Sequence, residues 1–208
     1  MNNTLEAKGV TIWRGETLLL DAVDLTVGPG EVLQLAGANG SGKTTLLGAL
    51  CGLAELDEGE VHWNGKLLHK DRAAFADALL YLGHRPGISG GLTPVENLEL
   101  FCALNGGDAA NIESVLDELS LGLQSMLPCR VLSAGQQRRV ALARLRLQQR
   151  KLWILDEPLT SLDTAGLDWV RTRIAEQAAA NGSVIFTTHQ VLNLDSVPIQ
   201  TLHLEASA

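Results

Sequence analysis

Apolar residues in the first third of this chain alternate with polar ones, which is the spacing of half-buried strands. The alternating positions are Val23, Leu25, Val27, Val61 and Trp63. Asn64-Gly65 follows the last of them, and this dipeptide favours a two-residue hairpin turn. We therefore expect short strands between Thr4 and Val27 and a hairpin at Asn64-Gly65.

The central part of the chain, from about residue 85 to residue 150, has helical spacing instead. Pro86-Gly87 and Gly90-Gly91 suggest a flexible connector at its start. Thr93, Pro94 and Glu96 then have the order of a helix start, with a cap, a proline in the first turn and a capping box. The pattern predicts a helical subdomain inserted into the chain.

Short apolar segments on both sides of this insert predict buried strands, at 32–35, 79–82, 152–155 and 184–187. A helix between the last two is marked by Leu167, Val170, Ile174 and Ala178, and ends near Asn181-Gly182. The order predicts an α/β fold with a mixed sheet core, an N-terminal antiparallel β subdomain and the helical insert. We expect a single domain over 1–208, with 1–84 and 151–208 as the nucleotide-binding lobe and about 85–150 as the helical subdomain.

Composition narrows the class of protein. The 208 residues carry a net charge of −8, which argues against nucleic acid as a partner. The three cysteines are far apart without a C-x-x-C pair, which favours free thiols over disulfides or a metal site. Because no basic-apolar leader and no run of eighteen apolar residues is present, we expect neither a signal peptide nor a membrane span.

A glycine-rich loop follows the strand predicted at 32–35 and precedes a helix at 45–50. It consists of Gly37, Ala38, Asn39, Gly40, Ser41, Gly42, Lys43, Thr44 and Thr45. Its pattern is G-x-x-x-x-G-K-T, whose backbone N–H groups cradle phosphate, and the flanking elements argue against a chance glycine turn. Lys43 is expected to neutralise the β- and γ-phosphates of ATP, and Thr44 to bind Mg²⁺.

Two carboxylates, Asp156 and Glu157, end the strand predicted at 152–155. We expect Asp156 to hold Mg²⁺ and Glu157 to act as the general base toward the attacking water. Two solvated acids at a strand end would be the ordinary alternative. In the segment Leu132 to Gln136, Ser133 and Gly135 are expected to cap a helix that runs from about Gln136 to Leu147, and a serine hydroxyl at a helix start is an anion-binding arrangement. The arginines that follow are expected to form a solvated basic helix face, at Arg138, Arg139, Arg144 and Arg146.

These motifs together resemble the ATPase subunits of ABC transporters. The resemblance implies that Ser133, Ala134, Gly135 and Gln136 read the γ-phosphate held by a second ATPase subunit, so that ATP joins a dimer. It also assigns Asp163 to the dimer loop, His189 to the γ-phosphate and the orientation of Glu157, and Trp13 to stacking on adenine, although a core tryptophan was the alternative there. The loop joining the lobes usually carries a glutamine; here that position is His84, followed by Arg85.

Longer strings resemble the ATP-binding subunit of the bacterial haem exporter used in cytochrome c maturation, over nearly the whole chain. They are Tyr81–His84 with Pro86–Ile88, Leu132–Leu145 and Thr187–Gln190. The departure is Arg85, where that family often has glutamine. The resemblance implies a peripheral protein on the cytoplasmic face of the inner membrane, with small integral membrane subunits as partners. The chain itself is expected not to bind haem, because no C-x-x-C-H is present.

Four other functions are alternatives to this one. An ABC ATPase for another small molecule keeps the same chemistry, and the sequence leaves it open. A non-transport ABC protein acting on ribosomes or DNA is disfavoured by the single cassette and the lack of a heptad run. A P-loop kinase or GTPase would not need Ser133 or His189, and a nucleotide-binding module without activity would not need the full set of Lys43, Asp156, Glu157 and His189.

Overall fold

The computed structural model describes residues 3–190, 192–194 and 197–205. The chain divides into two compact units. The sheet unit comprises Met1–Tyr81, Arg150–Asp156 and Ile174–Ala208, and the helical unit comprises Leu82–Gln149 and Glu157–Arg173. The expected lobes assigned 82–84 and 157–173 to the nucleotide-binding part, whereas both segments belong to the helical unit.

The antiparallel sheet of the sheet unit has the strand order β2-β1-β4-β5. Its strands are β1 Leu5–Arg14, β2 Thr17–Val27, β4 Glu58–Trp63 and β5 Lys66–Leu67. The hairpin predicted at Asn64-Gly65 is confirmed, because it joins β4 to β5 and Asn64 has a positive φ of 54°. The prediction of short strands between Thr4 and Val27 is wrong: β1 and β2 are ten and eleven residues long. Their pairing shifts register three times, between Ala7 and Trp13, and each shift interrupts the alternation that marks a strand in sequence.

The second sheet has the strand order β6-β7-β8-β3-β9. Its strands are β3 Val32–Ala36, β6 Leu79–Leu82, β7 Leu152–Leu155, β8 Ser183–Thr187 and β9 Ile199–His203. Strand β3 pairs in parallel with both β8 and β9, and β7 pairs in parallel with β8. Every residue of β7 and β8 is buried, as expected for the inner strands of a parallel sheet. The predicted strands at 32–35, 79–82, 152–155 and 184–187 are confirmed.

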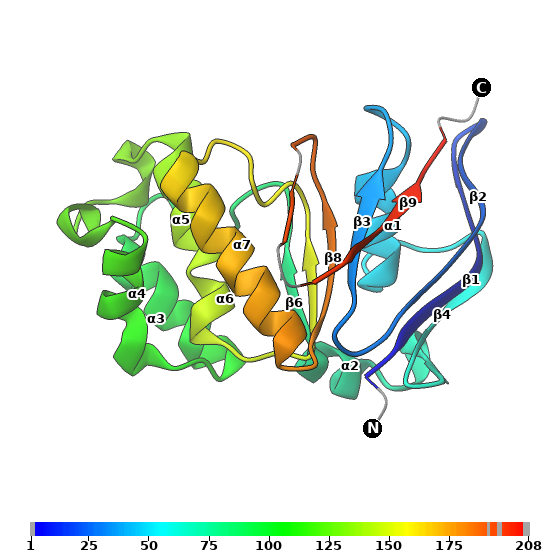
Figure 1. Ribbon diagram of the computed structural model, residues 1–208, viewed down its shortest axis with the longest axis horizontal. Coiled ribbons are helices and arrows are strands. Elements are labelled where there is room, and N and C mark those ends of the chain that lie inside the picture. The colour runs from blue at the N-terminus through cyan, green and yellow to red at the C-terminus, as the bar shows by residue number, and fades with distance from the viewer. Residues whose placement is uncertain (1–2, 191, 195–196, 206–208) are drawn as a thin grey trace. The chain divides into compact units, whose positions relative to one another are not determined.

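One hydrophobic core joins the two sheets through helix α1, Lys43–Leu50 (Figure 1). Leu46, Leu47 and Leu50 on α1 are completely buried in this core. The core also contains residues of the antiparallel sheet, such as Leu5, and residues of the parallel sheet, such as Ile154. The phosphate loop is thereby anchored at both ends, because β3 precedes it and α1 follows it. Helix α2, Arg72–Ala78, and the 3-10 turn η1, Leu68–Lys70, complete the elements between β5 and β6.

The helical unit has a separate core in which Leu98, Leu116 and Val140 are almost fully buried. Its helices are α3 Pro94–Asn105, α4 Ile112–Glu118, α5 Ala134–Leu142 and α6 Arg144–Leu147, with 3-10 turns η2 Ala109–Asn111, η3 Gly122–Gln124 and η4 Cys129–Val131. Helix α7, Thr164–Ala179, begins in this unit and ends in the sheet unit. The capping box predicted at the start of α3 is confirmed, with Thr93 as the cap and Glu96 returning the bond.

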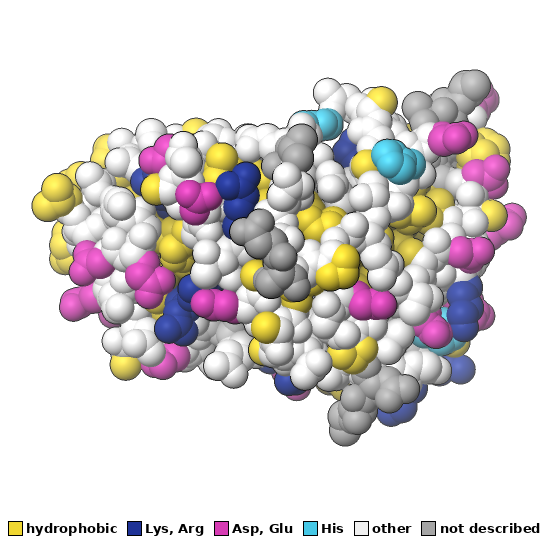
Figure 2. All heavy atoms as spheres, in the orientation of Figure 1, with side chains coloured by type: hydrophobic (Ala, Val, Ile, Leu, Met, Phe, Trp, Pro, Cys, Tyr) yellow, Lys and Arg dark blue, Asp and Glu magenta, His cyan; other side chains and the backbone are white. Residues whose placement is uncertain are grey.

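The surface is mixed in charge. On the face shown in Figure 2, Lys and Arg side chains are interspersed with Asp and Glu side chains. All three cysteines, Cys51, Cys102 and Cys129, are free, and all three are also buried. Burial raises the pKa of Cys51 to about 12. Within the described ranges, every helix is too short or too polar to pass through a bilayer.

Candidate functional site

Glycines shape the loop between β3 and α1 in two different ways. A Cβ on Gly37 would lie 2.6 Å from Ser41 Oγ and 2.5 Å from the carbonyl oxygen of Leu204, so no side chain fits there. Gly42 precedes α1 with φ 86°, in the left-handed region, and a Cβ on it would lie 2.7 Å from the Leu20 side chain. Both positions need glycine, which keeps the backbone N–H groups accessible at close range.

Lys43 folds back over the loop that precedes it. Its Nζ donates hydrogen bonds to the carbonyl oxygens of Gly37 at 2.9 Å and Ala38 at 2.7 Å. The side chain is 9% exposed, so the ammonium group is held at the loop rather than in solvent. Ser41 Oγ is buried and has no hydrogen-bond partner among the described residues. A buried hydroxyl of this kind next to a positive charge is suited to an anionic ligand.

Asp156 lies where three parallel strands end. It follows β7, whose last residue, Leu155, is paired with Phe186 of β8, and β8 in turn pairs with β3, which leads into the glycine loop. Asp156 Oδ2 accepts a hydrogen bond from Thr44 Oγ1 at 3.0 Å, and Oδ1 accepts one from Thr187 Oγ1 at 2.7 Å. The carboxylate is 1% exposed. The structure therefore brings together the two residues expected to bind Mg²⁺, Thr44 and Asp156.

His189 follows β8 by two residues and is exposed. Thr188, between them, accepts a hydrogen bond from the backbone N–H of Gln190 at 3.0 Å, which turns the chain after the strand. This turn places His189 at the same carboxyl edge of the sheet that carries Asp156 and the glycine loop. Ligands in open α/β sheets bind at this edge.

In the helical unit, Ser133 is the N-cap of α5. Its Oγ accepts a hydrogen bond from Gln136 N at 3.2 Å, while Gln136 Oε1 accepts one from Ser133 N at 2.9 Å. The expectation that Gly135 also caps the helix is wrong, because Gly135 lies inside its first turn. A Cβ on Gly135 would lie 2.5 Å from the carbonyl oxygen of Ser161, so this glycine allows the loop after Glu157 to approach the helix.

The same loop is held to α5 by an ion pair. Arg139 Nη2 lies 2.5 Å from Asp163 Oδ2, and Asp163 Oδ1 accepts a hydrogen bond from Gly166 N at 2.9 Å at the start of α7. The hydrogen bond from Arg139 lowers the pKa of the Asp163 carboxyl below its usual value. Asp163, expected in the dimer loop, is thus a fixed point between α5 and α7.

Arg138 is buried, and this corrects the expectation of a solvated basic helix face. It is 4% exposed, and its guanidinium donates to the carbonyl oxygens of Gly83 at 2.9 Å and Glu157 at 2.8 Å. Arg144 is also partly buried, which lowers its pKa, and its Nη2 donates to the Gly87 carbonyl oxygen at 2.6 Å. Of the four arginines, only Arg146 is exposed. The charge pattern predicted that these arginines face solvent. It could not show that backbone carbonyl oxygens are available to accept hydrogen bonds from a buried guanidinium.

A family model described as ABC transporter matches residues 20–160. This range covers more than half of the chain and includes the glycine loop, Ser133 and both carboxylates. The chain belongs to the ABC transporter ATPases. It hydrolyses ATP, as the members of this family do, and the resemblance drawn from the motifs is confirmed.

Curated relatives of this ABC ATPase are similar over nearly their whole length. The chain is 45% identical over 202 residues to "Cytochrome c biogenesis ATP-binding export protein CcmA" of Nitrosomonas europaea, covering 96% of this chain and 95% of the relative. A protein of the same name from Aromatoleum aromaticum is 48% identical over 189 residues, covering 89% and 88%. The Shigella flexneri protein of that name is 44% identical, covering 96% of each chain. The CcmA group is therefore its family within the ABC ATPases.

Solved structures agree with the fold. The structure of an ATP-binding subunit of an ABC transporter has a TM-score of 0.84 at 26% identity, covering 98% of this chain and 88% of that one. A dimeric ATP-binding cassette in a post-hydrolysis state, bound to ADP and phosphate, has a TM-score of 0.81 at 23% identity, covering 97% and 96%. The second likeness concerns the fold alone.

Trp13 lies near the end of β1 and is 48% exposed, so the alternative of a core tryptophan is wrong for this ABC ATPase. Its backbone N–H donates to Asp57 Oδ2 at 2.7 Å. Trp13 is paired with Leu18 on β2, and the neighbouring Leu20 of β2 reaches Gly42 of the phosphate loop. The ring is thus carried by the sheet that contacts the loop, and its stacking on adenine stays a prediction.

His84 and Arg85 both have exposed side chains in the segment after β6. This segment was expected to be a flexible connector. Its backbone is bonded to the helices instead, since the carbonyl oxygens of Gly83, Gly87 and Gly90 each accept a hydrogen bond. The assignment of the glutamine position to His84 stays a prediction.

Sequence reasoning missed Thr187, Asn97 and Arg138. Thr187 stands in the string Thr187–Gln190, but no sequence pattern gives its bond to Asp156, because that bond depends on β8 lying beside β7. Asn97 is 5% exposed, and its side-chain amide binds both the backbone N–H and the carbonyl oxygen of Ser89. Arg138 did carry a signal: the residues three, four and seven positions later, Ala141, Leu142 and Leu145, are apolar and buried, so Arg138 lies on the inner stripe of the helix.

The phosphate loop fits ATP by its own chemistry. It combines a cradle that a Cβ would fill, a buried Ser41 hydroxyl and an ammonium group that already donates to two carbonyl oxygens. Thr44 Oγ1 and the Asp156 carboxylate supply hard oxygen ligands side by side, which suits Mg²⁺.

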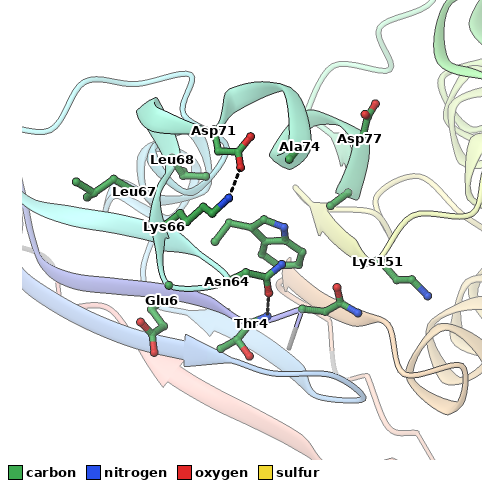
Figure 3. Close-up of a pocket in the computed structure, with 14 residues that line it drawn as sticks. Thr4, Glu6, Asn64, Lys66, Leu67, Leu68, Asp71, Ala74, Asp77 and Lys151 are labelled. Atoms are coloured by element: carbon green, nitrogen blue, oxygen red, sulfur yellow. Dashed lines mark hydrogen bonds and ion pairs between the residues drawn. The ribbon is translucent and has the colours of Figure 1, made fainter. Parts of the chain in front are cut away.

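A separate cavity of about 810 Å³ opens between β4, β5 and α2 in the sheet unit (Figure 3). Its lining includes Trp63 and none of the residues of the phosphate loop. Lys66 and Asp71 point toward one another at its rim, with Nζ and Oδ2 2.9 Å apart. Asn64 Oδ1 accepts a hydrogen bond from Thr4 N at 3.1 Å. Two pairs of polar groups at the cavity thus bind each other.

Proposed function

We propose that this ABC ATPase powers haem export, or the release of a haem-loaded chaperone complex, in the biogenesis of c-type cytochromes. The observation that carries the proposal is the identity of 44–48% to relatives named as cytochrome c biogenesis ATP-binding export proteins. The chain would act as a peripheral subunit at the cytoplasmic face of the inner membrane, with small integral membrane subunits as partners. Haem would be handled by those partners and not by this chain.

The phosphate loop would bind the β- and γ-phosphates of ATP. Backbone N–H groups between Gly37 and Thr45 would donate to phosphate oxygens, and Lys43 would exchange its two carbonyl acceptors for them. The Ser41 hydroxyl would donate the bond that it lacks among the described residues. Thr44 and Asp156 would hold Mg²⁺, which would neutralise charge on the phosphates during transfer. Trp13 would stack on the adenine ring.

Glu157 would be the general base toward the attacking water, and His189 would contact the γ-phosphate. Glu157 directly follows Asp156 in the chain, and its backbone is fixed within the helical unit through its carbonyl oxygen. Ser133, Ala134, Gly135 and Gln136 would bind the γ-phosphate held by a second copy of the chain. Ser133 already caps α5, so its hydroxyl and the first N–H groups of that helix lie together.

Glu157→Gln tests the catalytic assignment. The variant should bind ATP as the wild type does, lose ATP turnover by at least 10²-fold, and accumulate as an ATP-bound dimer, because a neutral amide cannot accept the proton. Glu99→Gln is the matched control, since Glu99 is an exposed carboxylate of the helical unit. Turnover is measured by phosphate release and dimer formation by size-exclusion chromatography. A Glu157→Gln protein that still hydrolyses ATP at the wild-type rate would show that another group is the base.

The cargo is tested by purifying the full chain from native membranes in mild detergent, with mass spectrometry and an absorption spectrum of the complex. We expect small cytochrome c maturation subunits and a haem Soret band that stays with the membrane subunits after this chain is removed. Recovery of an unrelated permease without haem would discard the haem assignment and keep the ATPase, as the alternative of another small-molecule exporter predicts.

A further inference from the structure

Arg138 connects two segments of the helical unit, around Gly83 and Glu157, that are 74 positions apart in the sequence. Its Nη1 donates to the Gly83 carbonyl oxygen at 2.9 Å and, more weakly, to that of His84 at 3.5 Å, while Nη2 donates to the Glu157 carbonyl oxygen at 2.8 Å. A guanidinium is planar and always charged, so its donors have fixed relative directions. The three carbonyl groups are therefore held in one geometry by one side chain.

The backbone of Glu157 needs such support. Its φ is 49°, in the left-handed region that non-glycine residues rarely adopt, at a cost of about 1–3 kcal/mol. Its carbonyl oxygen accepts a bond from Thr160 N at 3.2 Å as well as the bond from Arg138. The backbone dihedrals of a residue set the direction of its Cα–Cβ bond. By holding the carbonyl oxygen of Glu157, Arg138 therefore also fixes the direction in which the Glu157 side chain leaves the backbone.

The other end of the contact is the segment that carries His84 and Arg85. This segment is held along its length by the helices: Arg138 binds Gly83, Arg144 binds Gly87, and the backbone N–H of Arg130 donates to the Gly90 carbonyl oxygen at 2.9 Å. Arg138 is the member of this set that also reaches Glu157. One guanidinium thus binds both the segment after β6 and the backbone of Glu157.

We propose that Arg138 is a positioning residue for ATP hydrolysis, which fixes the backbone of Glu157 to the segment after β6 and so aims the Glu157 carboxylate. The proposal rests on the proposed function, in which Glu157 is the base. Lysine should not replace it, because one ammonium group on a flexible stem cannot hold the carbonyl groups of Gly83 and Glu157 with the fork geometry of a guanidinium. Arg138 therefore affects the chemical step of hydrolysis and not the affinity for ATP.

The test compares Arg138→Lys and Arg138→Met with Arg146→Lys and Arg146→Met in the full chain. Arg146 is a matched control because it is an arginine of the next helix, α6, and its side chain is exposed. The lysine variant keeps the charge in the buried position, so the proposal can still be tested if the methionine variant does not fold. We expect kcat to fall about 10- to 100-fold in Arg138→Lys, while KM for ATP and Tm stay near the wild-type values. Both Arg146 variants should match the wild type.

A second readout separates aiming from general damage. The double variant Arg138→Lys with Glu157→Gln should form the ATP-bound dimer as readily as Glu157→Gln alone, because the surfaces that bind nucleotide are unchanged. Wild-type kcat in Arg138→Lys would overturn the proposal, and so would a joint loss of Tm and dimer formation, which would make Arg138 only structural. If Glu157→Gln itself kept full turnover, the proposed function would fail first, whatever the Arg138 variants do.

Discussion

The two units position their functional groups by different means. In the sheet unit, backbone geometry does most of the work: strand ends bring Asp156 and the glycine loop to one edge, and Gly37 and Gly42 shape the loop. In the helical unit, side chains that bind backbone groups position the functional groups. Ser133 caps α5, Arg138 binds the backbone of Gly83 and Glu157, and Asn97 binds the backbone of Ser89.

Because of this difference, removing a side chain is expected to affect activity in one unit and the free energy of unfolding in the other. A side chain in the phosphate loop can be removed without opening a core, because the loop is anchored by β3 and α1. A polar side chain buried in the helical unit cannot be removed without leaving its partners unsatisfied, which costs about 1–3 kcal/mol. The comparison predicts a large loss of activity at constant stability when a charge is removed from the phosphate loop. It predicts a loss of stability at constant ATP affinity when a buried amide that binds only backbone of the helical unit, such as Asn97, is removed.

The largest expected effect is that of Lys43→Ala on turnover. Loss of one preorganised charge at the phosphates should lower kcat by at least 10²–10³-fold, while Tm changes little, because Lys43 binds only carbonyl oxygens of its own loop. The measurement is ATPase activity beside thermal unfolding. Lys66→Ala, at an exposed ion pair of the same unit, should keep full activity. A Lys43→Ala protein that loses Tm as well as activity would break the comparison.

The next effect is that of Asn97→Ala on stability. The Asn97 amide accepts from Ser89 N at 2.7 Å and donates to the carbonyl oxygens of Ser89 and Thr93, each at 3.0 Å. Its removal should lower the free energy of unfolding of the helical unit by about 1–3 kcal/mol, because Ser89 N loses its acceptor and the carbonyl oxygens of Ser89 and Thr93 each lose one of two donors.

Denaturant unfolding measures this change, with the exposed Asn105→Ala as the matched control in the same helix. ATP affinity should stay at the wild-type value, since the phosphate loop belongs to the other unit. A loss of ATP affinity without a loss of stability would contradict the division of roles.

The same difference explains what the sequence could reveal. The glycine loop, the carboxylate strand and the cap at Thr93 are local patterns, and each predicted its structure, because turn chemistry and strand ends depend on neighbouring residues. Arg138 and Thr187 depend on segments that only the fold brings together, Gly83 with Glu157 and β8 with β7. The charges at Arg138 and Arg144 therefore predicted a solvated surface where the structure has buried bonds to carbonyl oxygens.

The smallest expected effect is that of Thr93→Ala at the start of α3. Thr93 Oγ1 accepts a hydrogen bond from Glu96 N at 3.2 Å, and Glu96 Oε2 accepts one from Thr93 N at 2.8 Å. Loss of the cap should cost about 1 kcal/mol, and Thr93→Ser should restore it, because a serine hydroxyl caps equally well. Since each side chain completes the other's bond, Thr93→Ala with Glu96→Ala should cost less than the sum of the two single variants. Strict additivity in denaturant unfolding would mean that the two bonds act independently, and the helical unit would then depend less on reciprocal side-chain contacts than its structure indicates.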